Sequence, residues 1–529
     1  MRINRREFFL ASSAAALAGA AGPEKSQIGL IRSTHRGLRS PAPLDDPLNY
    51  TQVRDMVFRA ISLGTPGAGS LEAKIKPGAW VVVKPNIVSL RPRPSYAPGD
   101  VTDFRVTQAV VEYVASRTRA GRITVAEGGS YRNLTDTARD NVFMQDGRRV
   151  DALTFDWGPD EFPGFNGSLG GILDRCARRY PEKKFDYVDL SYDAVRDPGG
   201  ALRRIAVPAS ANGTGAFSDR PDYYVTNTIT SCDFLITVPV MKVHLMCGIT
   251  ACLKNYVGTA PREAYSVPGV FSNQNLHSQH SCGGRIDPFI VDLAAFHPPD
   301  YCVVDGIRGL QSQEHANQRP DQTVRSNLIL AGEDPVATDA LIARLLGFQS
   351  NDIDYFHMAE RRGMGTMDFS RIDVRGDEPD RDTRRWEKPS RWYGRCNRNW
   401  VLRTASGWKP HESRHDTLDL PKATGIPPAD GARYLARVEV ISEGHSRGYL
   451  WIGARGRLLA RLNDEPVAQL EADTRYRVGQ YQYPVTLAPG RNKLEFGSQP
   501  IGGEALLSVL LTGPRNDGDT AEGIRWQQA

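Results

Sequence analysis

The sequence has no excess of charge of one sign. Its 529 residues carry 66 Lys and Arg against 61 Asp and Glu, a formal net charge of +5 at pH 7. So small a charge on a chain of this length gives no electrostatic basis for nucleic-acid binding. Hydrophobic residues make up 40% and charged residues 24%. This ordinary globular composition excludes wholesale disorder, a coiled coil and a polytopic membrane protein.

Long hydrophobic runs are also missing, and one short apolar stretch lies close to the start. Residues 1–22 read MRINRREFFLASSAAALAGAAG, in which Arg5 and Arg6 precede that stretch and small residues follow at 18–20. The stretch is too short for a membrane span but has the parts of a twin-arginine export signal. We therefore expect recognition by the twin-arginine translocase and removal of 1–22. The mature protein is expected in the periplasm or outside the cell, with no stable membrane span.

Cysteine is scarce and irregularly spaced. There are seven, an odd number at scattered positions, which excludes a disulfide framework, although an exported protein can hold one or two bridges. The sequence also has no Walker loop, HExxH motif, GxSxG elbow or CxxCH haem signature. None of the reactions that these motifs mark is therefore indicated.

Residues 51–375 alternate between strand and helix patterns. Strands are predicted at 80–83, 122–126, 234–240, 301–304 and 327–331, and helices at 106–119 and 335–346. This alternation predicts an α/β domain with a mostly parallel sheet covered by helices. Residues 23–50 are expected to be an irregular N-terminal segment. Residues 128–230 interrupt the alternation and are expected to form insertions and loops over the sheet.

The remainder of the chain has a different character. Residues 376–430 form an Arg-, Pro- and Trp-rich connector that contains Trp386, Trp392, Trp400 and Trp408. These indoles either pack against both neighbours or form an aromatic platform for a sugar. Residues 431–529 show short alternating runs separated by turns, which predicts an antiparallel β-sandwich. The segments LARLNDEPVAQL and PVTLAPGRNKLEFG resemble jelly-roll modules of the galactose-binding-like kind, which implies glycan binding or packing alone.

Charged or amide residues follow the predicted strands of the α/β domain where each strand ends. In chain order they are Lys84 with Asn86, Glu127, Lys242 with His244, Asp305, and the segment 332–335. In an open parallel sheet, ligands bind beyond the carboxyl ends of the strands. We therefore expect these five ends to define one pocket.

The residue types in this pocket suit acid/base chemistry on an anion. His244 is the expected proton-transfer group, because its ordinary pKa lies near neutrality. Lysines that face one crevice attract phosphate, sulfate or carboxylate groups and lower one another's pKa. We assign catalysis to His244, Lys242, Lys84 and Asp305, and substrate binding to Asn86, Glu127, Lys254, Asn255 and Asp339. The carboxylates could also orient the cations or hold a divalent metal.

A second cluster lies in the polar stretch SNQNLHSQHSCGG. It contains His277, His280 and Cys282, whose side chains and spacing suit zinc or another transition metal. A fourth ligand would come from Asp287, Asp292, Cys247 or Cys252. The alternative is a polar loop with incidental histidines. The cofactor is therefore left open, with a divalent or transition metal as the candidate.

Several segments of the α/β region together resemble the domain of unknown function family 362. They are KPN at Lys84, ITVAEGG at Ile123, CDFLITVPVMKVHLMCGITACLKNYVG, FIVDLAAFHPPDYCVVDGIRGL and EDPVATDALIARLLG, spread over residues 51–375. The resemblance implies that family motif positions are occupied by Lys84, Asn86, Lys242, His244, Lys254, Asn255, Asp305 and Asp339. It implies no reaction. Some relatives carry iron–sulfur ferredoxin modules, but this sequence has no CxxCxxC run.

These features lead us to expect an exported enzyme that performs hydrolysis, elimination or isomerisation. Its substrate would be an anionic small molecule or a carbohydrate derivative. Two alternatives stay open. One is a metal- or iron–sulfur-linked redox protein. The other is a non-enzymatic carbohydrate-binding protein that uses the β-sandwich and the tryptophans.

Overall fold

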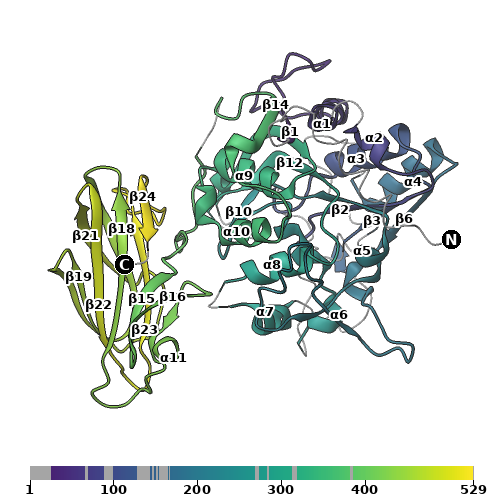
Figure 1. Cartoon of the computed structure of the whole chain (residues 1–529). Coiled ribbons are helices and arrows are strands. Elements are labelled where there is room, and N and C mark those ends of the chain that lie inside the picture. The colour runs from purple at the N-terminus through teal and green to yellow at the C-terminus, as the bar shows by residue number, and fades with distance from the viewer. Residues whose placement is uncertain are drawn as a thin grey trace, which may run out of the picture.

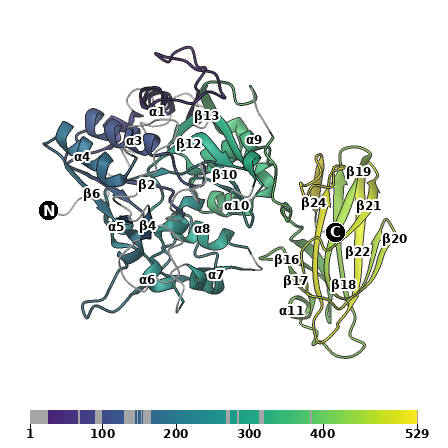
Figure 2. The ribbon, with the colours of Figure 1, turned by 180° about the vertical axis from the view of Figure 1, so that it is seen from behind.

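The computed structural model describes residues 25–65, 69–88, 99–127, 143–145, 148–150, 153, 165, 167–267, 273–282, 285–312, 319–381 and 385–527. The predicted export signal at 1–22 lies outside these residues. Figures 1 and 2 show an α/β domain and an all-β domain side by side, joined by an extended segment. Within the described parts of the chain, no helix combines the length and apolarity needed to cross a membrane.

An eight-stranded sheet forms the centre of the α/β domain. Its strands lie in the order β14 (Ile372–Gly376), β1 (Ser26–Arg32), β13 (Thr323–Gly332), β12 (Tyr301–Leu310), β9 (Phe234–Val238), β2 (Trp80–Pro85), β3 (Arg122–Ala126) and β6 (Lys184–Val188). β13 is antiparallel to both neighbours, and all other pairs are parallel. The predicted mostly parallel sheet is therefore confirmed.

Helices cover both faces of this sheet, because alternate side chains of each strand enter different apolar cores. Val81 and Val83 of β2 belong to a core with α1 (Tyr50–Gly64), α3 (Phe104–Arg117) and α4 (Leu169–Arg179). Val82 belongs to a core with α8 (Asp287–Ala294), α9 (Pro335–Leu346) and α10 (Asp354–Arg361). This burial on both faces explains why the strands read as continuous apolar runs.

Helix α9 has the limits that its sequence predicts. The Asp334 side chain accepts a hydrogen bond from the Ala337 N–H at 2.8 Å, and Pro335 occupies the first turn. Gly347 ends the helix in the left-handed conformation, at φ 82°.

Shorter elements connect these strands and helices. They are α2 (Leu71–Lys74), β4 (Phe143–Gln145), β5 (Arg148–Val150), η2 (Leu190–Tyr192), β7 (Arg204–Ala206), β8 (Asp222–Tyr224), α5 (Asn227–Ser231), β10 (Lys242–His244), β11 (Gly248–Thr250), η3 (Lys254–Thr259), α6 (Arg262–Tyr265), α7 (Gln274–His280), η4 (Pro320–Gln322), η5 (Ser350–Asp352) and η6 (Phe369–Arg371).

The structure differs from the expected segment boundaries in three places. The N-terminal segment at 23–50 contains β1, which is buried between β13 and β14 because its IGLI run is apolar. The insertion at 128–230 contains β6, which pairs with β3 at the sheet edge. The connector at 376–430 contains β15 (Asn399–Thr404), so the all-β domain begins earlier than residue 431.

The all-β domain is a curled antiparallel sheet around its own core. Its other elements are β16 (Gly407–Glu412), β17 (Leu418–Asp419), α11 (Leu420–Thr424), β18 (Tyr434–Ser442), β19 (Ser446–Leu462), β20 (Glu465–Ala472), β21 (Tyr481–Leu487), β22 (Gly490–Gln499), β23 (Leu506–Thr512) and β24 (Ile524–Gln527). The first part of β19 pairs with β21 and β23, and the last part pairs with β20 and β22. Gly456, at φ 124°, lies where the partners change. The predicted β-sandwich class is confirmed.

The tryptophans of the connector mostly pack inside the protein. Trp386, Trp392 and Trp400 are buried. Trp408 is 36% exposed, but the Arg437 guanidinium lies 4.5 Å from the centre of its ring. These four indoles therefore form no open platform on which a sugar could stack.

All seven cysteines lie among the described residues. Each one is buried, and each has a free thiol. The one or two disulfide bridges that an oxidising compartment permits are therefore not formed in this structure.

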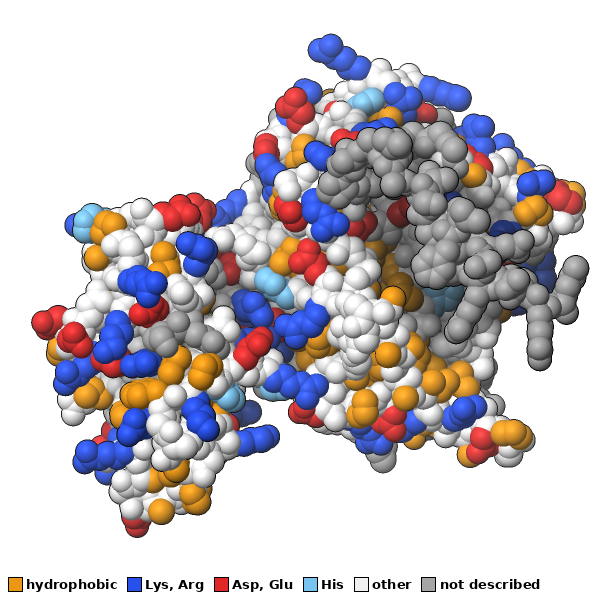
Figure 3. Space-filling model, viewed as in Figure 1, with side chains coloured by type: hydrophobic (Ala, Val, Ile, Leu, Met, Phe, Trp, Pro, Cys, Tyr) orange, Lys and Arg blue, Asp and Glu red, His pale blue; other side chains and the backbone are white. Residues whose placement is uncertain are grey.

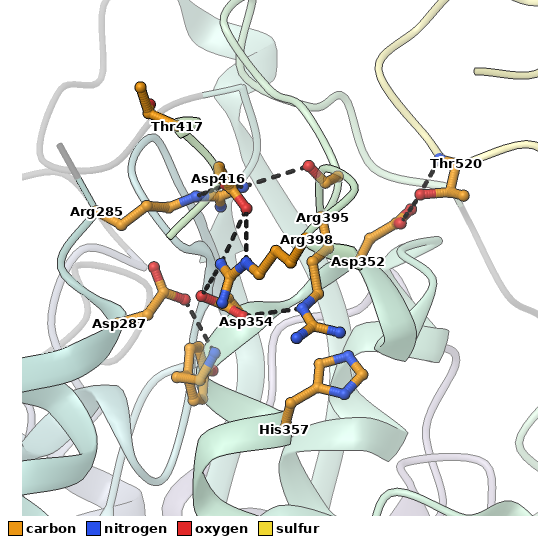
Figure 4. A network of polar contacts seen from close by, with 12 residues as sticks. Arg285, Asp287, Asp352, Asp354, His357, Arg395, Arg398, Asp416, Thr417 and Thr520 are labelled. Atoms are coloured by element: carbon orange, nitrogen blue, oxygen red, sulfur yellow. Dashed lines mark hydrogen bonds and ion pairs between the residues drawn. The ribbon is translucent and has the colours of Figure 1, made fainter. Parts of the chain in front are cut away.

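A network of buried ion pairs joins the two domains (Figure 4). The Asp416 carboxylate contacts Arg285 of the α/β domain at 2.8 Å and Arg398 at 2.9 Å. Arg398 also reaches Asp354, the first residue of α10, at 2.6 Å. Asp416 is 1% exposed, and the two arginines hold its pKa at about 2 against the effect of burial. Asp416 therefore carries its negative charge in the interface between the packed domains.

Asp416→Asn is expected to lower the free energy of unfolding by about 3–5 kcal/mol, because it leaves two buried guanidinium groups without their shared carboxylate. Urea unfolding measures this loss. Asp473→Asn, at an exposed position, is the matched control and should change stability by less than about 0.5 kcal/mol. Equal stabilities of the two variants would contradict the role of Asp416.

Candidate functional site

The direction in which successive strands are added to the sheet reverses between β2 and β9. From β2 the chain continues to β3 on one side, whereas β9 lies on the other side and continues to β12. In open α/β sheets a crevice forms at such a switch point, beyond the carboxyl ends of the strands. Asn255 of η3 lies at this crevice. Its side-chain amide donates to the Lys84 carbonyl at 3.0 Å and to the Thr237 hydroxyl at 2.9 Å. One side chain thus ties the ends of both strands together.

Lys84 and Glu127 form a buried ion pair at this crevice. Lys84 Nζ lies 2.5 Å from Glu127 Oε2 and donates to Asn255 Oδ1 at 3.0 Å, and both charged side chains are 1% exposed. Burial lowers the pKa of Lys84, while Glu127 opposes that shift. The Lys84 side chain is therefore held in place, its positive charge is balanced by Glu127, and it does not face solvent.

Asn86 carries a polar group that the surrounding protein leaves unsatisfied. Its amide nitrogen donates to Asn255 Oδ1 at 3.3 Å. Its own Oδ1 is buried, and among the described residues no donor reaches it. A buried acceptor without a donor is costly, so this oxygen is suited to a ligand or a water molecule.

Lys242 and His244 lie on the same face of β10, since strand side chains alternate. Lys242 is completely buried and contacts Asp100 through the carbonyl at 2.6 Å and the carboxylate at 3.0 Å. His244 is 4% exposed and accepts the Met246 N–H at Nδ1, 3.2 Å away. In the neutral ring this bond leaves the proton on Nε2, which makes His244 a donor at that atom.

The carboxylates of Asp305 and Asp339 accept hydrogen bonds from backbone N–H groups. Asp305 accepts the N–H groups of Asp103 at 2.7 Å and Ile307 at 2.9 Å. Asp339 accepts those of Cys252 at 2.7 Å and Leu253 at 3.1 Å. Burial raises the pKa of each to about 7. Both acids therefore position the loops around the crevice, a role that sequence spacing does not reveal.

His277 lies near the strand-end residues. Burial, together with the positive charges of Lys254 and Arg262, lowers its pKa to about 4. Its ring meets Phe289 edge-on at 5.1 Å. His277 is thus a neutral neighbour of Lys254, the half-buried lysine that begins η3.

The other two predicted metal ligands have separate surroundings. His280 stacks on Tyr223 at 3.9 Å, and its Nδ1 lies 3.2 Å from the Ser218 hydroxyl. Cys282 instead lies close to Asp219 and His415. The thiol sulfur, a carboxylate oxygen and an imidazole nitrogen of these residues all lie within 4.8 Å of one another. Across the described ranges no other such group of three is formed, so His277, His280 and Cys282 are not brought together.

The group of Asp219, Cys282 and His415 has donors of the kind that bind a transition metal with an open fourth position. Asp219 also contacts Arg414 at 2.9 Å. Sequence reasoning found only Cys282, because the other two residues lie far from it along the chain.

One predicted strand end lies elsewhere. Because β13 is antiparallel to β12, its carboxyl end at 332–335 is at the opposite edge of the sheet from Lys84, Glu127 and Lys242. There Glu333 contacts Lys74 at 2.6 Å. Asp305, predicted to follow a strand that ends at residue 304, lies inside β12, which continues to Leu310, at the level of Val240 beyond β9. The ends of β2, β3 and β9 therefore share the edge that carries the candidate site.

Residues 208–344 match the model of a family described as Domain of unknown function (DUF362). This match supports the resemblance to that family and includes Lys242, His244, Lys254, Asn255, Asp305 and Asp339. No protein with a curated description matches the chain.

Three solved structures share parts of the architecture at low similarity. The lactate racemase apoprotein from Thermoanaerobacterium thermosaccharolyticum is 12% identical over 54% of this chain and 52% of that one, at a TM-score of 0.27. The PA14 domain of the MpAFP antifreeze protein is 11% identical over 18% and 53%, at 0.15. A family 35 carbohydrate binding module from an environmental isolate is 18% identical over 20% and 75%, at 0.15. The chain spans about half of the first two, and scores this low carry no argument about function.

Gly258 packs against the Lys84–Glu127 pair, and Gly258→Ala is expected to disrupt it. An added Cβ would lie 2.6 Å from Lys84 Nζ and 2.7 Å from Glu127 Oε2. Overpacking of this kind costs about 1–3 kcal/mol, which thermal or urea unfolding detects. Gly444→Ala is the control, because nothing lies within 4 Å of its added Cβ. A Gly258→Ala variant as stable as the control would show that the pair shifts freely.

The raised pKa of Asp339, about 7, predicts a pH dependence of stability. An unfolded Asp titrates near pH 3.9, so between about pH 4 and 7 the folded chain keeps a proton that the unfolded chain has lost. This contribution to stability is complete below about pH 4 and disappears as the pH rises through 7. Asp339→Asn removes it and should flatten the slope by at most about 1.4 kcal/mol per pH unit.

Urea unfolding between pH 4.5 and 8 tests this slope. The variant is also expected to be less stable at every pH, because its NH₂ group would face a backbone N–H. Asp430→Asn, at an exposed position, should keep the wild-type slope. An unchanged slope in Asp339→Asn would mean that Asp339 is ionised throughout this range.

Proposed function

We propose that this protein is an enzyme, exported by the twin-arginine route, that performs acid/base chemistry on an anionic small molecule at the carboxyl edge of β2 and β9. The observation that carries the proposal is that two polar groups follow the neighbouring strands β2 and β9 at this edge. His244 is held with Nε2 as a donor, and Asn86 presents a buried oxygen that has no donor among the described residues.

The same residues indicate the substrate class. A donor at His244 suits a carboxylate or carbonyl oxygen, and an acceptor at Asn86 suits a hydroxyl group. Lys254 adds positive charge near η3, as its effect on the pKa of His277 shows. A small hydroxy acid or sugar acid carries all three matching groups. Lys84 and Lys242 position the site in this proposal, because Glu127 and Asp100 already balance their charges.

The chemical step most consistent with this set is removal of a proton from the carbon that bears the hydroxyl group. The electron pair left on carbon delocalises into the adjacent carboxylate, and a hydrogen bond from His244 stabilises the developing charge. Glu127 is the carboxylate at this edge that can accept the proton. Both isomerisation and elimination begin with this step.

The test is exchange of carbon-bound hydrogen for deuterium. The full chain is incubated in D₂O with a panel of 2-hydroxy acids and sugar acids, and proton NMR follows loss of the signal next to the carboxylate. We expect exchange with at least one compound and a decrease of about 100-fold or more in His244→Ala, the usual size of an acid/base contribution. His445→Ala, at an exposed histidine, should leave the rate unchanged.

Circular dichroism of His244→Ala separates lost chemistry from lost folding. A folded His244→Ala variant with the wild-type exchange rate would remove His244 from the mechanism. No exchange with any member of the panel would contradict the proposed step.

A further inference from the structure

A second hollow, distinct from the crevice at the strand ends, lies where α10 meets the start of the all-β domain. Two adjoining cavities of about 510 and 420 Å³ occupy it. Both are lined by His357 and Arg361 of α10, by Arg395 and Arg398 of the joining segment, and by Glu412 of β16. These volumes suit a small molecule. Figure 3 shows Lys, Arg and His side chains gathered at this junction.

Positive charge exceeds negative charge in the network below this hollow. Among the described residues, the ion pairs of Arg285, Arg395 and Arg398 are made with two carboxylates, Asp354 and Asp416. A third carboxyl, Asp287, interacts with Arg285, but burial raises its pKa to about 7 and so reduces its negative charge. Arg398 contacts both carboxylates, whereas Arg395 reaches one oxygen of Asp354 through Nε alone, at 3.2 Å. The unbalanced charge therefore falls mainly on Arg395.

The outer nitrogens of Arg395 are available for a ligand. Within the part of the chain that the structure describes, neither Nη atom has a hydrogen-bond acceptor, and the side chain is 29% exposed. Figure 4 shows this guanidinium group beside the ring of His357. Burial and the neighbouring charge of Arg398 lower the pKa of Arg395. An anion at the Nη atoms would relieve both effects.

Arg361 and His357 of α10 form the wall of the hollow beside Arg395, and Arg361 adds a second positive charge. Arg361 is exposed and, over the described ranges, forms no ion pair; its guanidinium lies 6.0 Å from the centre of the Phe217 ring. His357 donates its Nε2–H to the Asn351 carbonyl at 3.0 Å, so Nδ1 of the neutral ring is an acceptor that suits a protonated oxygen or hydroxyl group of the ligand. Burial, with the charge of Arg395, lowers the pKa of His357. Glu360 directs its carboxylate away, to the Met367 N–H at 2.7 Å. Glu412 is the opposing acid, on an exposed strand residue.

We propose that this hollow binds the oxyanion group of a small molecule, a phosphate, sulfate or carboxylate, between Arg395 and Arg361, with the neutral His357 ring beside it. Guanidinium groups bind such oxygens with two parallel N–H donors, so a pair of them defines both position and orientation. Because α10 belongs to the α/β domain and Arg395 to the segment that leads into the all-β domain, the ligand also strengthens their association. The proposal is independent of the chemistry at the strand ends.

Isothermal titration calorimetry of the full chain with inorganic phosphate, inorganic sulfate and citrate tests the site, at an ionic strength held constant with chloride. We expect saturable binding of at least one anion, and the tightest of the three identifies the preferred group. Arg361→Gln should weaken that binding at least about tenfold, which corresponds to about 1.4 kcal/mol. Glu412→Gln should tighten it, since it removes the opposing carboxylate.

Matched variants make the result specific. Arg361 has no ion pair to lose among the described residues, so Arg361→Gln is expected to fold. Arg475→Gln removes the same charge from an exposed position of the all-β domain and should leave affinity unchanged. Absence of saturable binding by all three anions would overturn the proposal. Equal weakening in Arg361→Gln and Arg475→Gln would do the same, because it would indicate general charge attraction.

Discussion

The buried ion pair between Lys84 and Glu127 constrains everything at the carboxyl edge of the sheet. Removing two charges from water is tolerated only when they meet closely and their remaining hydrogen-bonding positions are filled. Asn255 accepts from Lys84 Nζ and also joins β2 to β9. Gly258 leaves no space beside the pair. This edge is therefore fixed by the protein itself, which is the condition for a preorganised site.

The same constraint separates positioning residues from residues that can meet a substrate. Lys242 is neutralised by Asp100, and Asp305 and Asp339 are occupied by backbone N–H groups. The sequence predicts that Lys84, Lys242 and Lys254 hold an anionic substrate. The ion pairs of Lys84 and Lys242 do not agree with that prediction. Asn86 Oδ1 has no donor among the described residues, and the Met246 N–H orients the His244 ring. The proposed chemistry uses these two groups together with Glu127 as the proton acceptor.

Buried ion pairs attach the all-β domain to the α/β domain. The four tryptophans of the connector are buried or covered by Arg437, while Asp416 and Arg398 contact Arg285 and Asp354. Three guanidinium groups around two carboxylates fix the domain and leave positive charge at the junction. One arrangement of side chains therefore provides both the attachment of the domain and the proposed anion site.

The sequence by itself determined the parts of this protein that depend on neighbouring residues. Continuous apolar runs identified five of the eight strands of the central sheet, and Asp334, Pro335 and Gly347 set the limits of α9 through its own caps. It also placed Lys84, Asn86 and His244 at the ends of strands that share one edge. Only the tertiary structure decided that β1 enters the sheet, that β13 is antiparallel, and which charges pair. Asp100 with Lys242, and Cys282 with Asp219 and His415, are separated by long stretches of chain. Such contacts form because a buried polar or charged group is stable only beside a suitable partner, and the packed fold determines which residues meet. A local sequence pattern therefore does not predict them.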